Sequence, residues 1–171
     1  AKYFILNFIN YEIDDIKNGN EIKILNIESR LVSDFPVNDI DVDTKIKGKV
    51  DRIDEYNGTL RIIDYKTGIV EPRDLEIGDW GDLTLDYKYS KVIQVLSYAF
   101  MANKTASYEN IEAGIISFKR LKKGFIKFTQ KGKPKQTNIT QEILDRYSIE
   151  LKKLILEISN KEIPFKEKDV E

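Results

Sequence analysis

The sequence predicts a mixed α/β domain, in which the elements follow the order αβββαββα. Three observations support this prediction. Apolar residues recur at helical spacing over residues 3–17 and again over residues 139–159, which is typical of helices that bury one face. Strand-like runs at residues 44–56 and 59–66 flank Asn57-Gly58. This dipeptide favours a tight type I′ hairpin, because both of its residues tolerate a positive φ.

The first half of the chain is predicted to contain one helix, three strands and their connections. The helix over residues 3–17 ends at Asn18-Gly19-Asn20, where the glycine permits the backbone to leave the helix. Residues 21–32 are rich in isoleucine and form the first strand. A polar loop with Pro36 and four aspartates then leads into the hairpin.

The segment after the hairpin is predicted to be irregular, because residues 67–89 contain scattered glycines and no periodicity. A helix follows over residues 91–102, and Ser90 is its expected N-cap. Residues 111–118 and 124–128 have the composition of a further strand pair.

The last helix is predicted over residues 139–159. Its apolar stripe consists of Ile143, Tyr147, Leu151, Leu154 and Ile158. Asn138 and Gln141 have the spacing of a capping box, so we expect them to begin this helix.

Length and composition limit the class of protein. The 171 residues match one ordinary domain, so we expect a single domain over residues 1–171. The 41% apolar content supports a folded core and excludes general disorder. No apolar run approaches the roughly 20 residues of a membrane span, and no signal-peptide pattern opens the chain. We therefore expect a cytoplasmic protein with no membrane partner.

The chain contains no histidine and no cysteine, and these absences restrict its chemistry more than its net charge of -1 does. Without cysteine, disulfides, thiol catalysis and cysteine-ligated metal sites are excluded for this chain. Without histidine, Ser-His-Asp catalysis and imidazole metal ligands are excluded as well. Catalysis must come from carboxylates, lysines, hydroxyls or a hard cation held by oxygen atoms.

The predicted hairpin brings two aspartates together. A two-residue turn pairs Asp54 with Arg61, and this opposite-charge pair supports the register. The same register places Asp51 opposite Asp64, with Lys66 on the same face. Directly opposed carboxylates repel each other, and a proton, Lys66 or a divalent cation would offset the repulsion. A cation fits best, because Mg²⁺ binds carboxylate oxygens at about 2.1 Å.

A plainer interpretation of this face also remains open, in which a solvated hairpin carries two aspartates bridged by Lys66. The tripeptide Asp-Tyr-Lys occurs at residues 64–66 and again at residues 86–88, so it is not specific by itself. The first copy differs because it ends a predicted strand, has an aspartate across the turn, and is followed by Thr67-Gly68. This context favours the metal site.

Three segments, taken in order, resemble the RecB-like branch of the PD-(D/E)XK nuclease superfamily, which includes the C-terminal nuclease domains of RecB and AddB type. They are Gly-Lys-Val-Asp-Arg-Ile-Asp at residues 48–54, Ile-Asp-Tyr-Lys-Thr-Gly at residues 63–68, and Gln-Val-Leu-Ser-Tyr at residues 94–98. The resemblance implies a restriction-endonuclease-like α/β fold, in which helices flank a mixed β-sheet. It also implies a deoxyribonuclease, exo- or endonucleolytic, that depends on Mg²⁺ or Mn²⁺ and acts in DNA repair or recombination.

The resemblance also implies roles for individual residues. Asp51, Asp64 and the backbone carbonyl of Tyr65 would ligate the metal. Lys66 would orient or help to deprotonate the attacking water and stabilise charge on the scissile phosphate. Two residues on one face of the following helix would contact Lys66 or the DNA backbone, namely Gln94 and Tyr98. A core-packed helix with a polar edge is the alternative interpretation of that last pair.

One departure from the family pattern concerns the metal site. Members usually carry a histidine or glutamate on an upstream helix that completes the site, and the nearest candidates here are Glu12 and Glu28. We therefore interpret the chain as the C-terminal part of a longer repair protein, with a helicase module in the same chain or complex. The missing ligand also leaves open a second function, a catalytically inactive module of the same fold that binds DNA or serves as a scaffold.

The near-neutral total charge conceals two blocks of opposite sign. Residues 117–135 hold eight basic residues and no acid, whereas residues 71–90 hold six acids against two basic residues. The basic block is expected to hold phosphates, and the acidic block to lie away from them, with Trp80 as its anchor. The residues expected to bind nucleic acid are Lys49, Arg120, Lys122, Lys123 and Lys127.

Overall fold

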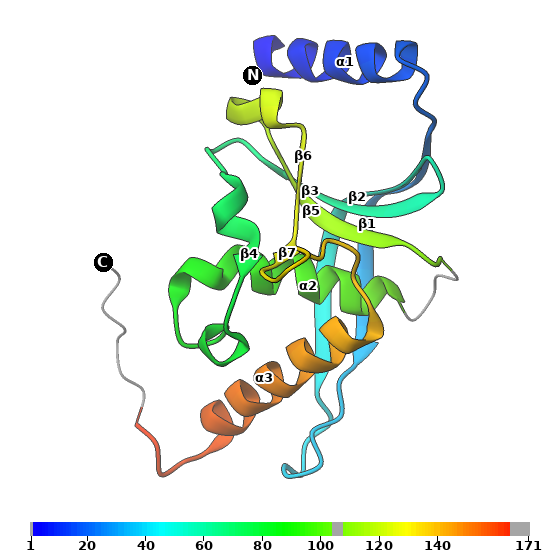
Figure 1. Ribbon diagram of the computed structural model, residues 1–171. Helices are drawn as coiled ribbons and strands as arrows, with labels where there is room; N and C mark the ends of the chain where they lie inside the picture. Colours follow the sequence, from blue (N-terminus) through cyan, green and yellow to red (C-terminus); the bar gives the residue numbers. More distant parts are fainter. Residues whose placement is uncertain (1, 104–107, 165–171) are drawn as a thin grey trace.

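The computed structural model describes residues 2–103 and 108–164, and it confirms the α/β architecture (Figure 1). Three α-helices and five main strands follow in the predicted order, with short 3-10 helices and two two-residue strands between them. The elements are α1 (Lys2–Lys17), β1 (Ile22–Asp34), β2 (Lys45–Tyr56), β3 (Thr59–Lys66), η1 (Pro72–Leu75), β4 (Glu76–Ile77), η2 (Trp80–Asp82), η3 (Tyr87–Tyr89), α2 (Ser90–Asn103), β5 (Ile111–Ser117), η4 (Phe118–Lys123), β6 (Phe125–Lys127), β7 (Thr129–Gln130) and α3 (Gln141–Ser159).

The main sheet is mixed, as the sequence predicts. Its strand order is β1-β2-β3-β5-β6, and a separate pair joins β4 to β7. β3 and β5 run parallel, while the other neighbours in the main sheet are antiparallel. The parallel pair requires a crossover, which α2 supplies. The carboxyl ends of β3 and β5 therefore lie side by side, with Lys66 paired to Ser117.

Helices cover both faces of this sheet. Neighbouring residues of a strand point to opposite faces, and Asp64 and Tyr65 show which helix lies on each. The Asp64 carboxylate accepts a hydrogen bond from Gln94 of α2, whereas the Tyr65 ring packs edge-on against Phe8 of α1. Figure 1 shows the same arrangement, with α1 on one side of the sheet and α2 and α3 on the other.

The β2–β3 hairpin has the predicted turn and register. Asn57 and Gly58 have φ values of 48° and 82°, as a type I′ turn requires. Asp54 pairs with Arg61 in the ladder, and the two side chains form a bidentate salt bridge with both N–O distances at 2.8 Å. Asp54 has no exposed surface, so this pair is part of the interior.

Two predicted helix caps are wrong. Ser90 has helical φ and ψ, because the 3-10 helix η3 runs directly into α2, and Asp86 caps η3 instead. Thr140 is the N-cap of α3 and accepts a hydrogen bond from the amide of Ile143. Asn138 accepts a hydrogen bond from the amide of Ile111 at the start of β5. At Ser90, the preceding 3-10 turn takes the place of a helix cap. At Asn138, a tertiary hydrogen bond to β5 occupies the side chain that would otherwise cap α3.

Most of the predicted apolar stripe of α1 does not pack against the sheet, and only Phe8 of that stripe makes a ring contact there. No residue of α1 is buried, and four isoleucines of the stripe are exposed. The face toward the sheet instead carries Glu12, which bonds to Arg52 at 2.6 Å, and Asp15, which accepts from Tyr56 at 3.1 Å. Polar contacts and the Phe8 ring therefore hold α1 in place.

No helix in the described ranges combines the length and the apolar character of a membrane span.

The irregular segment between β3 and α2 is anchored in the core, as expected for Trp80. This residue is 8% exposed, and its ring centroid lies 6.4 Å from that of Phe128. Leu75, Ile77 and Leu83 of the same segment are fully buried in one hydrophobic cluster with α2 and β5. The irregular segment between β3 and α2 is therefore part of the hydrophobic core of the domain.

Replacing Asp54 with alanine should cost about 3–5 kcal/mol of unfolding free energy, because two arginines lose a buried partner. Those arginines are Arg61 and Arg52, whose Nη2 lies 2.6 Å from Asp54 Oδ2. Denaturant unfolding followed by circular dichroism measures the change. Glu142→Ala is the matched control, because it breaks the exposed Glu142–Arg146 pair and should cost less than about 1 kcal/mol. A similar small loss for both variants would contradict the structural role of Asp54.

Candidate functional site

Asp64 lies at the centre of the candidate site. It follows the buried apolar run of β3 and is itself 4% exposed. Lys66, on the same face of β3, places its Nζ 2.9 Å from Asp64 Oδ2. From α2, Gln94 donates a hydrogen bond of 3.0 Å to Asp64 Oδ1. The carboxylate is thus held between a lysine of its own strand and an amide of the helix beneath the sheet.

Tyr98 joins this group through Gln94 and is seated on a glycine of β2. The Gln94 side-chain amide also donates to the Tyr98 hydroxyl at 3.1 Å, one helical turn away. A Cβ at Gly48 would lie 2.8 Å from both the Tyr98 ring and the Met101 methyl group. Only glycine admits this close approach of α2 to the sheet. The structure therefore brings together the three segments that carry the sequence motifs.

Asp51 reaches the site in a different way from the one the simple register predicts. The β2–β3 ladder ends at the pair Arg52–Ile63, one step before Asp51 and Asp64 would pair. Instead, Asp51 Oδ2 accepts a hydrogen bond of 2.7 Å from the backbone amide of Tyr65. The carboxylate takes the place of a backbone carbonyl at the point where the two strands separate.

The surroundings of Asp64 favour its protonated form. Burial raises the pKa of Asp64 above its ordinary value, and the nearby charge of Asp51 raises it further. The hydrogen bond and positive charge of Lys66 lower the pKa but do not cancel the effect of burial. A divalent cation beside the two carboxylates would supply the missing positive charge.

The donor set at this site fits a hard divalent cation, although the described side chains do not complete it. Asp64 Oδ2 is buried, and apart from its ion pair with Lys66 it receives no hydrogen bond from the described residues. Carboxylate oxygens are the ligands that Mg²⁺ and Mn²⁺ prefer. Within residues 2–103 and 108–164, no group of three acidic side chains is close enough to hold a metal ion.

Neither candidate for the upstream ligand lies free beside the two aspartates. Glu12 of α1 is bonded to Arg52, on the face of the sheet opposite to Asp64. Glu28 of β1 forms an ion pair with Lys49. The ligand that the family pattern expects is therefore not supplied by either residue in this arrangement.

Tyr65 connects the site to α1 and to the basic segment. Its ring stacks on Phe118 of η4, with centroids 5.6 Å apart and an interplanar angle of 23°. Its hydroxyl accepts a hydrogen bond from Arg52. Because Phe118 begins η4 directly after β5 and also packs against Phe8, this stack places η4 at the end of β3 on the face that α1 covers, whereas Lys66 and Asp64 share the other face.

Three of the five residues predicted to bind nucleic acid are engaged in ion pairs. Lys49 pairs with Glu28, Arg120 with Glu71 at 2.8 Å, and Lys127 with Glu112 at 2.8 Å. The other two, Lys122 and Lys123 of η4, are exposed and form no ion pair with any described residue.

The acidic and basic blocks of the sequence meet in the structure, which the sequence interpretation missed. Glu71 pairs with Arg120, and Glu76 pairs with Lys131 and Lys135. The opposite charges of residues 71–90 and 117–135 were the available signal, because complementary blocks in one domain attract each other. The buried Arg52 carried no comparable signal, since its partner Glu12 lies forty residues earlier.

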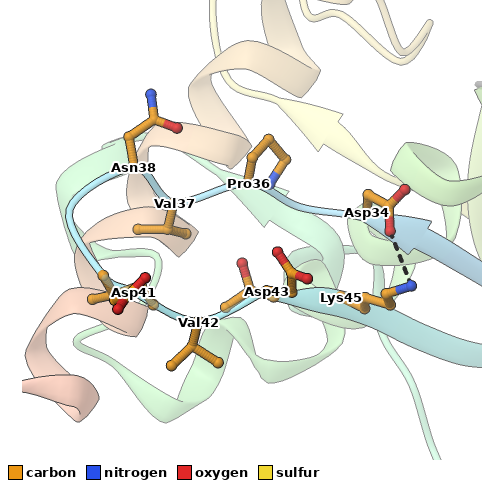
Figure 2. Close-up of a pocket in the computed structure, with 10 residues that line it drawn as sticks. Asp34, Pro36, Val37, Asn38, Asp41, Val42, Asp43 and Lys45 are labelled. Carbon is orange, nitrogen blue, oxygen red and sulfur yellow. Dashed lines mark ion pairs between the residues drawn. The ribbon is translucent and has the colours of Figure 1, made fainter.

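A separate cavity of about 730 Å³ lies in the loop between β1 and β2, away from this site (Figure 2). None of the predicted site residues lines it. Its lining includes three aspartates, of which Asp34 is paired with Lys45 at 3.3 Å. Among the described residues, no acidic cluster suited to a metal ion lies there.

Replacing Asp64 with asparagine should stabilise the domain near neutral pH. The folded state holds the Asp64 proton more tightly than the unfolded state, so stability falls as pH rises through the raised pKa. Asp64→Asn removes this penalty and should raise the melting temperature at neutral pH but not below the ordinary pKa of 3.8. Asp145→Asn on the exposed surface of α3 is the control. A lower melting temperature for Asp64→Asn at neutral pH would contradict the argument.

Comparisons with known proteins bear on the whole chain. No curated protein matches it. A family model described as the PD-(D/E)XK nuclease superfamily matches residues 7–169, which includes every strand of the sheet, the two helices α2 and α3, and all the residues of the candidate site. With this match and the α/β fold on which the site is built, the chain belongs to the PD-(D/E)XK nuclease superfamily.

Proposed function

We propose that this domain is a divalent-metal-dependent nuclease that hydrolyses phosphodiester bonds of DNA. The observation that carries the proposal is the convergence on Asp64 of Lys66, Gln94 and the neighbouring Asp51, each from a different motif. Membership of the nuclease superfamily supports the reaction class. A buried carboxylate with a raised pKa beside a lysine is a costly arrangement, and such arrangements are concentrated at functional sites.

In this proposal, Asp51, Asp64 and the backbone carbonyl of Tyr65 hold Mg²⁺ or Mn²⁺. A metal held there would supply Lewis-acid activation of a phosphoryl oxygen and would make water easier to deprotonate. Gln94 keeps the Asp64 carboxylate oriented through its 3.0 Å hydrogen bond. Tyr98 fixes the Gln94 amide in turn, because it accepts the second hydrogen bond of that amide.

Lys66 acts on the substrate side of the site. Its side chain is 34% exposed, whereas that of Asp64 is 6% exposed, so the ammonium group can reach a phosphate that the carboxylate cannot. There it would orient the attacking water and stabilise the charge that develops on the scissile phosphate. Its ion pair with Asp64 sets the direction from which it approaches.

The DNA backbone would pass over η4. Lys122 and Lys123 are exposed there, and the Tyr65–Phe118 stack holds η4 beside the end of β3. Engagement through phosphates predicts binding that depends strongly on salt and weakly on sequence. Arg120, Lys127 and Lys49 would contribute after exchanging their acidic partners for phosphate.

The assignment of a subfamily and a biological role to this domain rests on the sequence motifs. Their RecB-like form supports a role in DNA repair or recombination, a RecB/AddB-type domain at the C-terminal end of a longer chain, and a helicase module in the same chain or complex. We also propose a cytoplasmic location.

A second candidate function is a catalytically inactive module that binds DNA or serves as a scaffold. One observation favours it, namely that Glu12 and Glu28 are both committed to basic residues and leave the metal site short of a ligand. Calorimetric titration with Mn²⁺ separates the two. Binding that disappears in Asp64→Ala supports the nuclease, and absence of binding in the intact chain supports the scaffold.

Lys66→Ala should reduce cleavage of single-stranded or duplex DNA by about 100-fold or more, because the charge that stabilises the transition state is lost. The second Asp-Tyr-Lys copy provides a matched control. Lys88 forms the same kind of ion pair with Asp86 but lies outside the site, so Lys88→Ala should cleave at the original rate. Cleavage in Mn²⁺ and Mg²⁺, with chelator as a blank, measures both. Equal rates for Lys66→Ala and the intact chain would overturn the proposed role.

The double substitution Lys122→Ala/Lys123→Ala should weaken DNA binding similarly for all sequences. It should also reduce the slope of log affinity against log salt by about 0.7–0.9 for each lost phosphate contact. Fluorescence anisotropy with labelled oligonucleotides in chelator, which prevents cleavage, measures both quantities. Arg146→Ala, on the exposed surface of α3, is the control. An unchanged salt slope in the double variant would exclude η4 as the contact surface.

A further inference from the structure

Glu28 has an unusual backbone conformation in the middle of a long strand. It lies within β1, which runs from Ile22 to Asp34, and its φ is 54°. L-residues other than glycine rarely adopt this left-handed region, and a strand requires a negative φ. Such a conformation persists only where the surrounding structure imposes it.

The position of Glu28 in the sheet is directly across from Asp51. Ile27 pairs with Arg52 and Ser29 pairs with Val50, so Glu28 and Asp51 fall between these two pairs. The register is the same on both sides of Glu28, so no residue has been inserted as it would be in a β-bulge. The unusual backbone of β1 therefore lies at a position opposite Asp51 and not at an inserted residue.

The side chains of β2 show the same distortion. Val50 and Ile53 both belong to the hydrophobic core, although strict alternation would place residues three apart on opposite faces. Arg52 contacts Glu12 of α1 on the other face, as expected for a neighbour of Ile53, so the alternation breaks at Asp51, between Val50 and Arg52. The side chains of β2 therefore switch faces at the level where β1 has its left-handed residue, Glu28.

The distortion has a structural consequence on the edge of β2 that pairs with β3. The β2–β3 ladder stops at Arg52–Ile63, and a continuing ladder would have given the Tyr65 amide a backbone carbonyl as its acceptor. That amide instead donates to Asp51 Oδ2 at 2.7 Å. Separation of the strands thus gives the Asp51 carboxylate a fixed donor in the residue next to Asp64.

We propose that the left-handed backbone of Glu28 is a positioning element for Asp51, which sets the bend of the β1–β2 ribbon that directs the Asp51 carboxylate onto the Tyr65 amide. The backbone conformation of Glu28 sets this bend, and the Glu28 carboxylate plays no part in it. That carboxylate pairs with Lys49, and both side chains are more than half exposed, so the pair contributes little. The catalytic consequence rests on the proposed function, whereas the structural consequence does not.

Substitutions at Glu28 separate backbone shape from charge. Glu28→Gly and Glu28→Asn tolerate the left-handed region, whereas Glu28→Val opposes it because of its branched Cβ. Glu28→Gln removes only the charge. Arg30→Val, at an exposed position of the same strand, controls for the introduction of a valine, and Glu28→Ala is a milder variant should Glu28→Val fail to fold.

The first measurement is hydrogen exchange of the Tyr65 amide by NMR, and the second is the affinity for Mn²⁺ by calorimetry. We expect Glu28→Gly, Glu28→Asn, Glu28→Gln and Arg30→Val to keep the amide protected and the affinity unchanged. Glu28→Val and, to a smaller extent, Glu28→Ala should lose protection and bind Mn²⁺ about 10- to 100-fold more weakly, as for loss of a group that orients a ligand.

The outcomes distinguish this inference from the proposed function. Protection of the Tyr65 amide in both Glu28→Val and Glu28→Ala would overturn the inference. Loss of Mn²⁺ binding in Glu28→Gln and Glu28→Gly alike would also overturn it, because the carboxylate itself would then be the active part. If the intact chain binds no Mn²⁺ while the amide responds as expected, the inference stands and the proposed metal site fails.

Discussion

Asp64 is a carboxylate buried at the end of a core strand, with 4% of its surface exposed. Burial of an ionised group is costly unless opposite charge or hydrogen-bond donors offset the cost. Lys66 and Gln94 supply these contacts, and Gln94 can do so only because α2 lies close against the sheet, where Gly48 admits the Tyr98 ring. Segments far apart in the sequence therefore serve one carboxylate, and their positions relative to it determine what the domain can bind.

The opposite face of the same strands is equally constrained. Asp51 and Asp64 each have a neighbour in sequence, Arg52 and Tyr65, that points toward α1. Arg52 bridges Asp54 and Glu12. Burial by itself would lower the pKa of the Arg52 guanidinium, but Tyr65, Asp54 and Glu12 outweigh it, so the pKa is raised. A buried network of this kind is disrupted when one partner is removed. It links the anchoring of α1 to the strands that carry the site.

Charge pairing also changes how the surface should be understood. The basic block of the sequence is not a free cationic patch, because Glu71, Glu76 and Glu112 engage several of its members. The exposed lysines of η4 remain available near the carboxyl ends of β3 and β5. In these pairs the basic side chains are 42–63% exposed, whereas the acidic side chains are 15–28% exposed, so solvent reaches mainly the cationic groups.

The sequence by itself determined the order of the elements, the Asn57-Gly58 hairpin with its Asp54–Arg61 pair, and the group of motif residues around Asp64. These features depend on local periodicity, turn chemistry and register, which are properties of neighbouring residues. Only the tertiary structure decided that α1 packs through Glu12 and Phe8, that Thr140 caps α3, and that Asp51 meets the Tyr65 amide. Each of these depends on the contacts of distant segments, and in the last case on a left-handed Glu28 that no local preference would predict.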